Sequence, residues 1–392
     1  GLIFSALQRD GIGVDYWFGL GNEATLESAD FIAHFSADPS IHTVICYLEG
    51  VRGGRKFMQA ADEARRRGKN IVALRAGGHP QSARSTRSHT GKLPAAFDVY
   101  AGVFRQLGVI DVASLAELSY AMVLLTGVGA RLGPRVGIIS ASGGACSLLA
   151  DHVIDAGLEL PELSPALQEA LDRAIPEYGS SLNPVDLSAD VVSRAGILHG
   201  ALGALRENDS IDVWLVFGRP IVDRYYPALV EFAQASGKAT IVSCGVPLDQ
   251  KVHDALLAGG IPVLEDPALC LRALGRIQRA AGTSPVVPVK TGAQVLLDSR
   301  VRGNDDRIEL HVAIEEDRDF GPVLALSSGV MGRRVVRALP ASTDDLRDAA
   351  QELAAIDSRL CGSLDCIVGS LHDWIESNPL GTEARVDLAL TP

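Results

Sequence analysis

One histidine stands in a loop whose small residues would leave its ring accessible for chemistry. His89 lies in the run RSTRSHTG, which follows an apolar segment typical of a β-strand. A neutral imidazole can attack phosphorus, because a nucleophilic histidine splits one group transfer into two easier steps. The sequence therefore makes His89 a candidate phosphoryl carrier, with Ser88 and Gly91 as supporting residues. The alternative is a surface histidine that only donates hydrogen bonds, and residue spacing does not decide between the two.

A carboxylate follows another expected strand and is a candidate partner for this histidine. Glu49 comes directly after the continuous apolar run Thr43–Leu48. Ligands of doubly wound sheets collect at the carboxyl ends of the strands, where the His89 loop also begins. A carboxylate there would hold one ring nitrogen of His89 and leave the other free to attack. The alternative is an ordinary solvated acid at a strand end.

A glycine-rich turn offers a place for an anion. The run SASGGA at Ser140–Ala145 links an expected strand to an expected helix. Backbone N–H groups at such a helix start attract phosphate, which makes Ser142, Gly143 and Gly144 candidate phosphate-binding residues. The turn matches neither of the standard glycine-rich nucleotide motifs. Gly1 is a candidate for a second turn of the same kind.

A proline fixes the shape of a further turn. In NPVDLS the residue before Pro184 is pushed towards an extended conformation. Asn183 and Asp186 are then presented from a fixed loop and are candidate supporting residues of the site. A purely structural Asx turn explains the same residues.

Strand-like and helical segments alternate along the first part of the chain, which is the pattern of a doubly wound parallel sheet. Some strand-like runs are apolar throughout, as expected of strands buried on both faces. The polar stretch Arg75–Lys92 is too irregular for either element. The expected strands are Val14–Leu20, Thr43–Leu48 and Asn70–Leu74, and the expected helices are Ala24–Ser36, Gly53–Arg67 and Ala95–Gln106.

The same pattern restarts after the glycine-rich break Gly127–Pro134. We expect 1–130 and 135–281 each to be a flavodoxin-like or Rossmann-like α/β domain with a parallel sheet. Residues 282–308 are polar and turn-rich, which predicts a linker, and 309–392 predict a short α+β segment. The later expected strands are Arg135–Ser140, Ile211–Phe217, Ala239–Cys244, Ile261–Leu264 and Glu309–Ile314. The later expected helices are Gly144–Ala156, Tyr226–Ala235, Gln250–Leu257, Ala268–Ala280, Thr343–Ile356 and Leu364–Ile375.

Composition excludes several classes of protein. Of the 392 residues, 47% are hydrophobic and 21% charged, which is typical of a globular chain and not of a disordered one. The net charge of −12 argues against a nucleic-acid partner. No apolar run reaches the roughly 18 residues that a transmembrane helix needs, so we expect no membrane partner.

The cysteines predict free thiols in a reducing cytoplasm and no metal ligands. Cys361 and Cys366 are spaced too widely for a CxxC zinc motif, and no second pair accompanies them. The other four, in apolar or small-residue surroundings typical of buried thiols, are Cys46, Cys146, Cys244 and Cys270.

Six ordered motifs together resemble one family, the nucleoside-diphosphate-forming acyl-CoA synthetases, which are relatives of succinyl-CoA synthetase. The resemblance covers about residues 1–281 without a large gap. Its motifs are LGNEA at Leu20–Ala24, CYLEGVRGGRKF at Cys46–Phe57, SHTGK at Ser88–Lys92, FRQLGVI at Phe104–Ile110, ISASGGA at Ile139–Ala145 and NPVDLS at Asn183–Ser188.

The resemblance implies that His89 is the phosphorylated histidine and that Glu49 steadies it. It also implies that the Ser142–Gly144 turn and the helix after Gly1 are two helix N-termini facing the phosphate. The implied reaction joins a carboxylic acid to CoA at the expense of ATP, through an acyl phosphate and the phosphohistidine, and releases ADP and phosphate. Mg²⁺ would accompany the nucleotide, and the implied assembly is a homo- or hetero-oligomer.

The last segment resembles the end of an ATP-grasp domain. Asp317–Pro322 is similar to the DPxFGP turn of that domain, and Glu376–Pro379 to its DxNP ending. The nucleotide-binding front of such a domain and a CoA-binding domain ahead of Gly1 are both expected to be missing. The run Ser327–Arg333 has no acid where the family has one that binds metal. We therefore expect the isolated chain not to form acyl-CoA by itself.

Three other interpretations remain open. One is a degenerate homologue that binds CoA, acyl-CoA or phosphate for regulation. Another is the synthetase-like half of a protein acetyltransferase, and the third is a subunit with a structural role only. The sequence identifies neither the acyl group nor whether the nucleotide is ATP or GTP.

Overall fold

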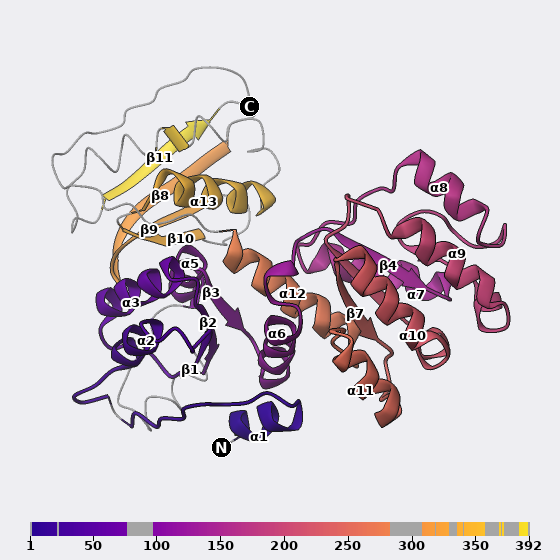
Figure 1. Ribbon diagram of the computed structural model, residues 1–392. Coiled ribbons are helices and arrows are strands. Elements are labelled where there is room, and N and C mark those ends of the chain that lie inside the picture. Colours follow the sequence, from indigo (N-terminus) through magenta and orange to yellow (C-terminus); the bar gives the residue numbers. More distant parts are fainter. Residues whose placement is uncertain are drawn as a thin grey trace. The chain divides into compact units, whose positions relative to one another are not determined.

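The computed structural model (Figure 1) describes residues 2–21, 23–76, 97–282, 308–317, 319–328, 335–339, 341–356, 368–369, 371 and 384–390. The chain divides into two compact units. Residues 1–17 and 112–278 make up the first unit, and residues 18–111 and 279–392 the second.

The second unit contains a three-stranded sheet in the order β1-β2-β3. Strands β1 and β2 run parallel, with Thr43 opposite Asn70 and Leu48 opposite Arg75. The strands are β1 (Thr43–Leu48), β2 (Asn70–Arg75) and β3 (Val109–Val112), and the helices are α2 (Ser28–Ser36), α3 (Gly54–Arg66) and α5 (Phe97–Gln106). Phe57 of α3 and Phe104 of α5 stack with ring centroids 5.6 Å apart, and both are fully buried. Apolar side chains of the strands and helices thus form one core.

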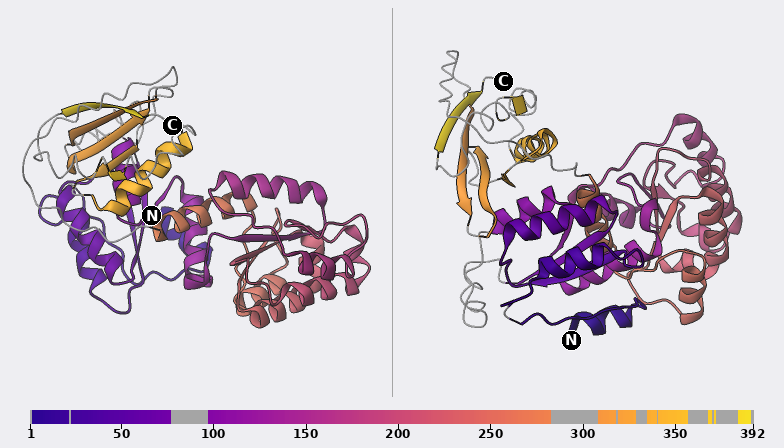
Figure 2. Two further views of the ribbon diagram at one scale, coloured as in Figure 1. Left: turned by 90° about the horizontal axis from the view of Figure 1, so that it is seen from above. Right: turned by 60° about the vertical axis from the view of Figure 1, so that its left-hand side comes forward.

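A second sheet in the same unit comes from the end of the chain. Its order is β10-β9-β8-β11, and every neighbouring pair is antiparallel. The strands are β8 (Ile308–Asp317), β9 (Gly321–Ser328), β10 (Val335–Ala338) and β11 (Ala384–Leu390). Helix α13 (Thr343–Ile356) packs along this sheet, as Figures 1 and 2 show. Phe320, Val323 and Val336 belong to the same core as Phe57 and Phe104, so the two ends of this unit share a hydrophobic interior.

The first unit is built on a four-stranded parallel sheet in the order β5-β4-β6-β7. Its strands are β4 (Val136–Ser140), β5 (Val185–Asp186), β6 (Val213–Phe217) and β7 (Ala239–Ser243). From β4 the chain continues to β5, which lies on one side of β4, and then to β6, which lies on the other side of β4. This reversal between β4 and β6 is the place where ligands bind to doubly wound sheets.

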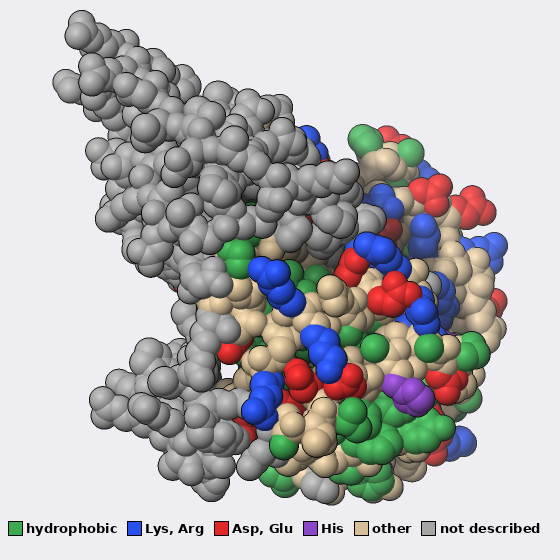
Figure 3. All heavy atoms as spheres, turned by 90° about the vertical axis from the view of Figure 1, so that its left-hand side faces the viewer, with side chains coloured by type: hydrophobic (Ala, Val, Ile, Leu, Met, Phe, Trp, Pro, Cys, Tyr) green, Lys and Arg blue, Asp and Glu red, His purple; other side chains and the backbone are tan. Residues whose placement is uncertain are grey.

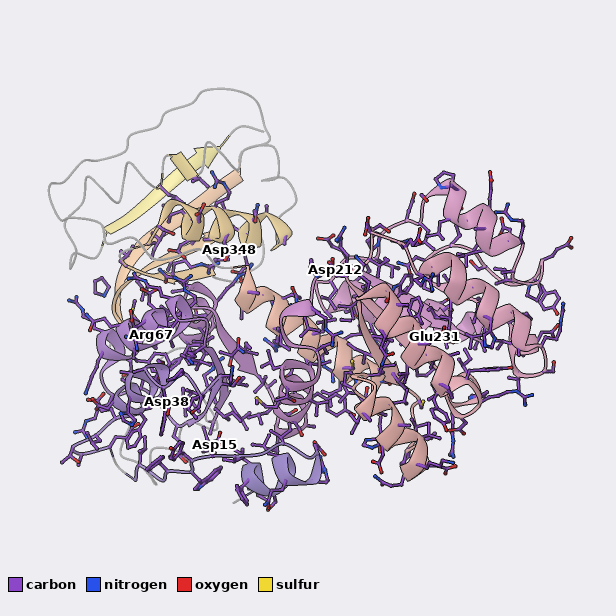
Figure 4. All side chains as sticks on the ribbon, in the orientation of Figure 1. Asp15, Asp38, Arg67, Asp212, Glu231 and Asp348 are labelled. Carbon is purple, nitrogen blue, oxygen red and sulfur yellow. The ribbon has the colours of Figure 1, made fainter. Side chains whose placement is uncertain are left out.

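Helices and short loops surround this parallel sheet. Ser164 starts α8 (Pro165–Asp172) by accepting the Leu167 N–H on its hydroxyl, and Pro165 occupies the first turn, as is common at helix starts. Arg135 and Asp212, which is labelled in Figure 4, tie the starts of β4 and β6 with N–O distances down to 2.6 Å. The helices of this unit are α1 (Leu2–Arg9), α6 (Leu115–Gly127), α7 (Gly143–Asp155), α8 (Pro165–Asp172), α9 (Ala195–Leu205), α10 (Arg219–Ser236), α11 (Gln250–Ala258) and α12 (Pro267–Ala281).

The expected fold class is confirmed: the chain is a mixed α/β protein with parallel sheets. The helix expected at Thr343–Ile356 matches α13 to the residue. The expected strands that coincide with β1, β2, β4, β6 and β7 are also confirmed within one or two residues.

Four of the expected elements are wrong or misplaced. The helix expected at Tyr226–Ala235 is part of α10, which begins seven residues earlier, at Arg219. Val14–Leu20 is not a strand, and no strand in the described part of the chain pairs with these residues. Helix α2 begins at Ser28 and not at Ala24, because Asp30 accepts the Glu27 N–H and starts the helix there. Ile261–Leu264 contributes only a single bridge, between Val263 and Val242.

Other expected elements fall on residues that the structure does not describe. Almost all of the linker expected at 282–308 and most of the helix expected at Leu364–Ile375 lie there.

Within the described residues, no helix is both long and apolar enough to cross a lipid bilayer. On the face that Figure 3 shows, Lys and Arg side chains lie among Asp and Glu side chains. On α3, Asp62 pairs with Arg65 and Arg66.

Candidate active site

Glu49 lies at the carboxyl end of β1, beside the end of β2. Leu48 is the register partner of Arg75, and the Leu48 carbonyl accepts the Ala76 N–H at 2.9 Å. Residue 76 is the last described residue before the segment that carries His89. The Glu49 carboxylate is half-buried and stands at the edge from which that segment leaves the sheet. The expectation that His89 belongs to the same edge falls on residues that the structure does not describe, so it stays a prediction.

A short loop from Glu49 to Gly53 connects β1 to α3. Gly50 has a φ of +151°, a backbone conformation that residues with a side chain rarely adopt. Val51 is buried, and its N–H donates to the hydroxyl of Tyr100 at 2.7 Å. Arg52 donates to the Glu23 carbonyl at 3.0 Å. The loop that bears the carboxylate is therefore held at two successive residues.

Glu23 is a buried acid behind this loop. It is only 8% exposed, and its Oε1 accepts the Ser28 N–H at 3.0 Å, close to the start of α2. Burial raises the pKa of the Cys46 thiol to about 12, and the nearby Glu23 carboxylate adds to this effect. Glu23 belongs to the LGNEA motif, but sequence reasoning gave it no role. The buried Glu23 side chain thus supports the end of β1 from the interior of the protein.

The C-terminal segment reaches the same loop. The Tyr100 hydroxyl donates to Asp319 Oδ2 at 2.9 Å, and the Asp317 carboxylate accepts the Asp319 N–H at 2.9 Å. Asp319 lies in the DRDFGP turn that sequence analysis compared with an ATP-grasp domain. Neither Tyr100 nor Asp319 was predicted as a site residue, since their contact joins positions 219 residues apart.

The Ser142–Gly144 turn begins helix α7 at the carboxyl end of β4. Ser142 has an extended backbone, and its hydroxyl accepts the Ala145 N–H at 3.4 Å. Gly143 and Gly144 are the first helical residues, and both are exposed. A Cβ on Gly144 would meet no atom within 4 Å, so the backbone there is open to a ligand. The geometry suits an anion at a helix N-terminus.

Asp186 limits the space on one side of this turn. It ends β5, its Oδ1 accepts the Ser188 N–H at 2.9 Å, and its Oδ2 would lie 2.9 Å from a Cβ on Gly143. A glycine at 143 therefore lets the carboxylate approach the helix start. An anion bound there must avoid this negative charge, which leaves the Gly144 side as the open approach.

Asn183 is engaged by the backbone around β4. Its Oδ1 accepts the Ile138 N–H at 3.0 Å, and its Nδ2 donates to the carbonyls of Val136 at 2.9 Å and Pro161 at 3.0 Å. The peptide bond between Asn183 and Pro184 is cis. Asn183 thus fixes the turn before Pro184, and its contact with a ligand stays a prediction.

Several candidate residues lie outside the described part of the chain. His89, Ser88 and Gly91 fall in the segment 77–96, and Gly1 is also not described. Their roles stay predictions. Among the described residues, no group of three or more His, Cys, Asp or Glu side chains is arranged to hold a metal ion.

Models of two protein families match the chain. Residues 1–125 match the succinyl-CoA ligase like flavodoxin domain, and residues 136–195 match the Ligase-CoA domain. Together they cover the regions that carry Glu49 and the Ser142–Gly144 turn.

Curated proteins named as ADP-forming acetate–CoA ligases are similar to the chain in sequence. Acetate–CoA ligase [ADP-forming] I of Archaeoglobus fulgidus is 30% identical over 292 residues, which are 74% of this chain and 42% of that protein. The alpha subunit of acetate–CoA ligase [ADP-forming] I of Pyrococcus furiosus is 30% identical over 275 residues, 68% of this chain and 59% of that subunit. The chain thus spans about half the length of the curated relatives it matches.

A solved structure shares the fold. The dinucleotide forming acetyl-coenzyme A synthetase 1 of Ca. Korarchaeum cryptofilum, in complex with phosphate and ADP, superposes with a TM-score of 0.63. It is 23% identical, and the match covers 71% of this chain and 61% of that one.

Proposed function

The chain belongs to the NDP-forming acyl-CoA synthetase family, and we propose that it carries the phosphohistidine core of such an enzyme. In this proposal a carboxylic acid, CoA and ATP become acyl-CoA, ADP and phosphate. The observation that supports it most is the place of Glu49, which ends β1 beside the residues where β2 leads into the His89 segment. Two parallel strands thus bring a carboxylate to the point where the segment that carries His89 begins.

The phosphoryl step uses His89 as nucleophile. Its unprotonated ring nitrogen attacks the phosphorus of an acyl phosphate, a P–N bond forms, and the bond from phosphorus to the acyl oxygen breaks. The carboxylate leaves, and the ring gains positive charge. The Glu49 carboxylate stabilises that charge and selects the ring nitrogen that attacks. A nucleoside diphosphate then accepts the phosphoryl group, and in the direction of acyl-CoA synthesis the steps run in reverse.

The phosphate is held by backbone groups. In this proposal the phosphate binds to backbone N–H groups at helix starts, which are those of Gly143 and Gly144 at the start of α7, with Ser142, and those of the helix after Gly1. The supporting residues of the proposal are Ser88, Gly91, Asn183 and Asp186.

The ligands, the assembly and the domains in this proposal follow from the family. The proposed ligands are CoA, ATP or ADP, phosphate and a small carboxylic acid, with Mg²⁺ accompanying the nucleotide. Because one relative is named as an alpha subunit, we propose a homo- or hetero-oligomer with no nucleic-acid or membrane partner. The proposed domains are 1–130 and 135–281, followed by a linker at 282–308 and an ATP-grasp-like segment at 309–392. Free thiols at Cys46, Cys146, Cys244 and Cys270 favour the reducing cytoplasm.

The test is a phosphorylation experiment on the purified chain. We expect acetyl phosphate, supplied as the phosphoryl donor, to leave one acid-labile, base-stable phosphate per chain. The His89→Asn variant should take no label, since it keeps a similar size but loses the nucleophile. His42→Asn is the matched control, because His42 is exposed and lies ahead of β1. It should label like the parent.

Equal labelling of His89→Asn and the parent would show that another residue is phosphorylated and would remove the proposal. A parent that takes no label but binds CoA or phosphate in calorimetry would favour the degenerate homologue.

A further inference from the structure

Tyr100 is buried where three segments of the second unit meet. Its hydroxyl accepts the Val51 N–H at 2.7 Å and donates to Asp319 Oδ2 at 2.9 Å, and the residue is only 4% exposed. The guanidinium of Arg75, the last residue of β2, lies 5.5 Å from the centroid of its ring. One phenol therefore touches the Glu49 loop, the end of β2 and the C-terminal segment.

The turn that carries Asp319 is itself firmly held. Asp317 Oδ1 accepts the N–H groups of Asp319 and Phe320 at 2.9 and 3.0 Å. The Phe320 ring meets the Tyr100 ring edge-on, with centroids 4.9 Å apart and an interplanar angle of 81°. A Cβ at Gly54, the first residue of α3, would overlap the Asp319 carbonyl oxygen, so only glycine allows this approach. The turn is thus packed against the loop that follows β1.

The hydrogen bonds of Tyr100 run in one direction. The Val51 N–H donates to the phenol, and the phenol donates to Asp319, so the carboxylate fixes the direction of both hydrogen bonds. Burial, and then the charge of Asp319, raise the pKa of Tyr100, so the phenol keeps its proton. Val51 lies two residues after Glu49, and a shift of its backbone moves the Glu49 carboxylate.

We propose that Tyr100 is a positioning residue for Glu49, and that Asp319 makes this positioning depend on the C-terminal segment. The proposal rests on the proposed function of Glu49 as partner of a phosphorylated histidine. Its consequence is coupling: the C-terminal segment acts on phosphoryl transfer through the Glu49 loop, without contacting the phosphoryl group.

The experiment compares four variants of the full chain. Tyr100→Phe removes only the hydroxyl and keeps the ring contacts. Asp319→Ala removes the acceptor, whereas Asp319→Asn keeps an acceptor oxygen. Tyr120→Phe is the matched control, because the Tyr120 hydroxyl also accepts a backbone N–H, that of Asp266 at 3.0 Å, in the other unit. Thermal unfolding first confirms that each variant is folded.

The first readout is hydrogen exchange of the peptide that covers residues 48–53, which does not depend on activity. We expect Tyr100→Phe and Asp319→Ala to speed exchange roughly two- to tenfold, the effect of losing one ordinary hydrogen bond. Asp319→Asn and Tyr120→Phe should exchange like the parent there. The second readout is the rate of labelling of His89 by acetyl phosphate, which the same two variants should slow while the final extent of labelling is unchanged.

Two results would overturn the proposal. Exchange in Tyr100→Phe and Asp319→Ala at the parent's rate would show that the hydroxyl does not hold the loop. Faster exchange with an unchanged labelling rate would show that the loop is held but Glu49 is not positioned by it. If the parent takes no label, the proposed function fails, and the exchange data alone decide whether Tyr100 and Asp319 hold the loop. If Tyr100→Phe does not fold, the contrast between Asp319→Asn and Asp319→Ala decides.

Discussion

The Gln106 side chain pairs with the backbone of Ala338 in both directions. Its Nε2 donates to the Ala338 carbonyl at 3.1 Å, and its Oε1 accepts the Ala338 N–H at 2.8 Å. Gln106 ends α5, Ala338 ends β10, and both are almost fully buried. A helix side chain thus supplies the hydrogen bonds that a neighbouring strand would give to β10, and within the second unit it ties the C-terminal sheet to α5.

Replacing Gln106 by leucine should destabilise the second unit. The change leaves a buried N–H and a buried carbonyl of Ala338 without partners, and we expect the free energy of unfolding to fall by about 2–4 kcal/mol. Gln351→Leu, at an exposed position of α13, is the control and should change it little. Denaturant midpoints of both variants check this. Equal midpoints would mean that the Gln106 bonds contribute nothing.

Helix α5 approaches β10 so closely that one position accepts only glycine. A Cβ on Gly102 would overlap the carbonyl of Val336, and this backbone cannot move without shifting the strand. Gly102→Ala should therefore cost about 1–3 kcal/mol. Gly203→Ala, inside α9 with nothing within 4 Å of the added carbon, should instead stabilise by about 0.5–1 kcal/mol. The two alanine variants should shift the midpoint temperature of thermal unfolding in opposite directions. A shift in the same direction would contradict the close packing of α5 against β10.

Asp345 should make stability depend on pH. Burial raises its pKa above the ordinary 3.8, although the Ser342 N–H and hydroxyl at 2.7 Å oppose this. The folded state therefore binds the proton more tightly than the unfolded state, and this stabilisation is lost as pH rises through the folded pKa.

Asp345→Asn, which keeps an acceptor oxygen but no charge, should gain stability relative to the parent between pH 4 and pH 7. Thermal unfolding across that range measures the difference. Asp344→Asn, at an exposed neighbouring position, should show a smaller change. If the difference in stability between Asp345→Asn and the parent became smaller towards pH 7, burial would not have raised the pKa of Asp345.

The buried cysteines should be unreactive in the folded chain. Burial raises the pKa of four thiols from 9.0 to about 12, so the thiolate fraction falls roughly a thousandfold. Alkylation at pH 8, followed by mass spectrometry of each peptide, should find them modified only after unfolding. Fast modification of any one would show that its site opens readily. The four residues are Cys46, Cys146, Cys244 and Cys270.

Much of the parallel architecture was predictable because burial on both faces leaves continuous apolar runs. Arg135–Ser140 coincides with β4, which is buried at every residue. Thr43–Leu48 coincides with β1, but Tyr47 is 54% exposed, so the expectation of burial on both faces was wrong for that strand. Val14–Leu20 looked similar, yet Tyr16, Trp17 and Phe18 are each more than half exposed. A strand requires a partner for its backbone, and the local sequence does not reveal whether one exists.

The candidate site was predictable only in part, for a similar reason. Strand ends and glycine turns have local signals, which is why Glu49 and Ser142–Gly144 stood out. Tyr100 is an ordinary helix residue and Asp319 an ordinary turn residue, and their hydrogen bond depends on the packing of segments 219 positions apart. The bracing role of Asn183 likewise depends on its neighbours along β4.

The pairing of Glu49 with a phosphorylated His89 is the central claim, and its direct measurement is the rate of His89 labelling in Glu49→Gln. Glutamine keeps the size of the side chain but cannot stabilise the charged ring. We predict that labelling by acetyl phosphate slows on the order of tenfold to a hundredfold, by analogy with the loss of the carboxylate partner of a metal-binding histidine. Glu63→Gln, at a half-buried α3 position whose carboxylate pairs with Arg67, should label at the parent's rate. If Glu49→Gln labels as fast as Glu63→Gln, Glu49 is not the histidine's partner and the account is wrong.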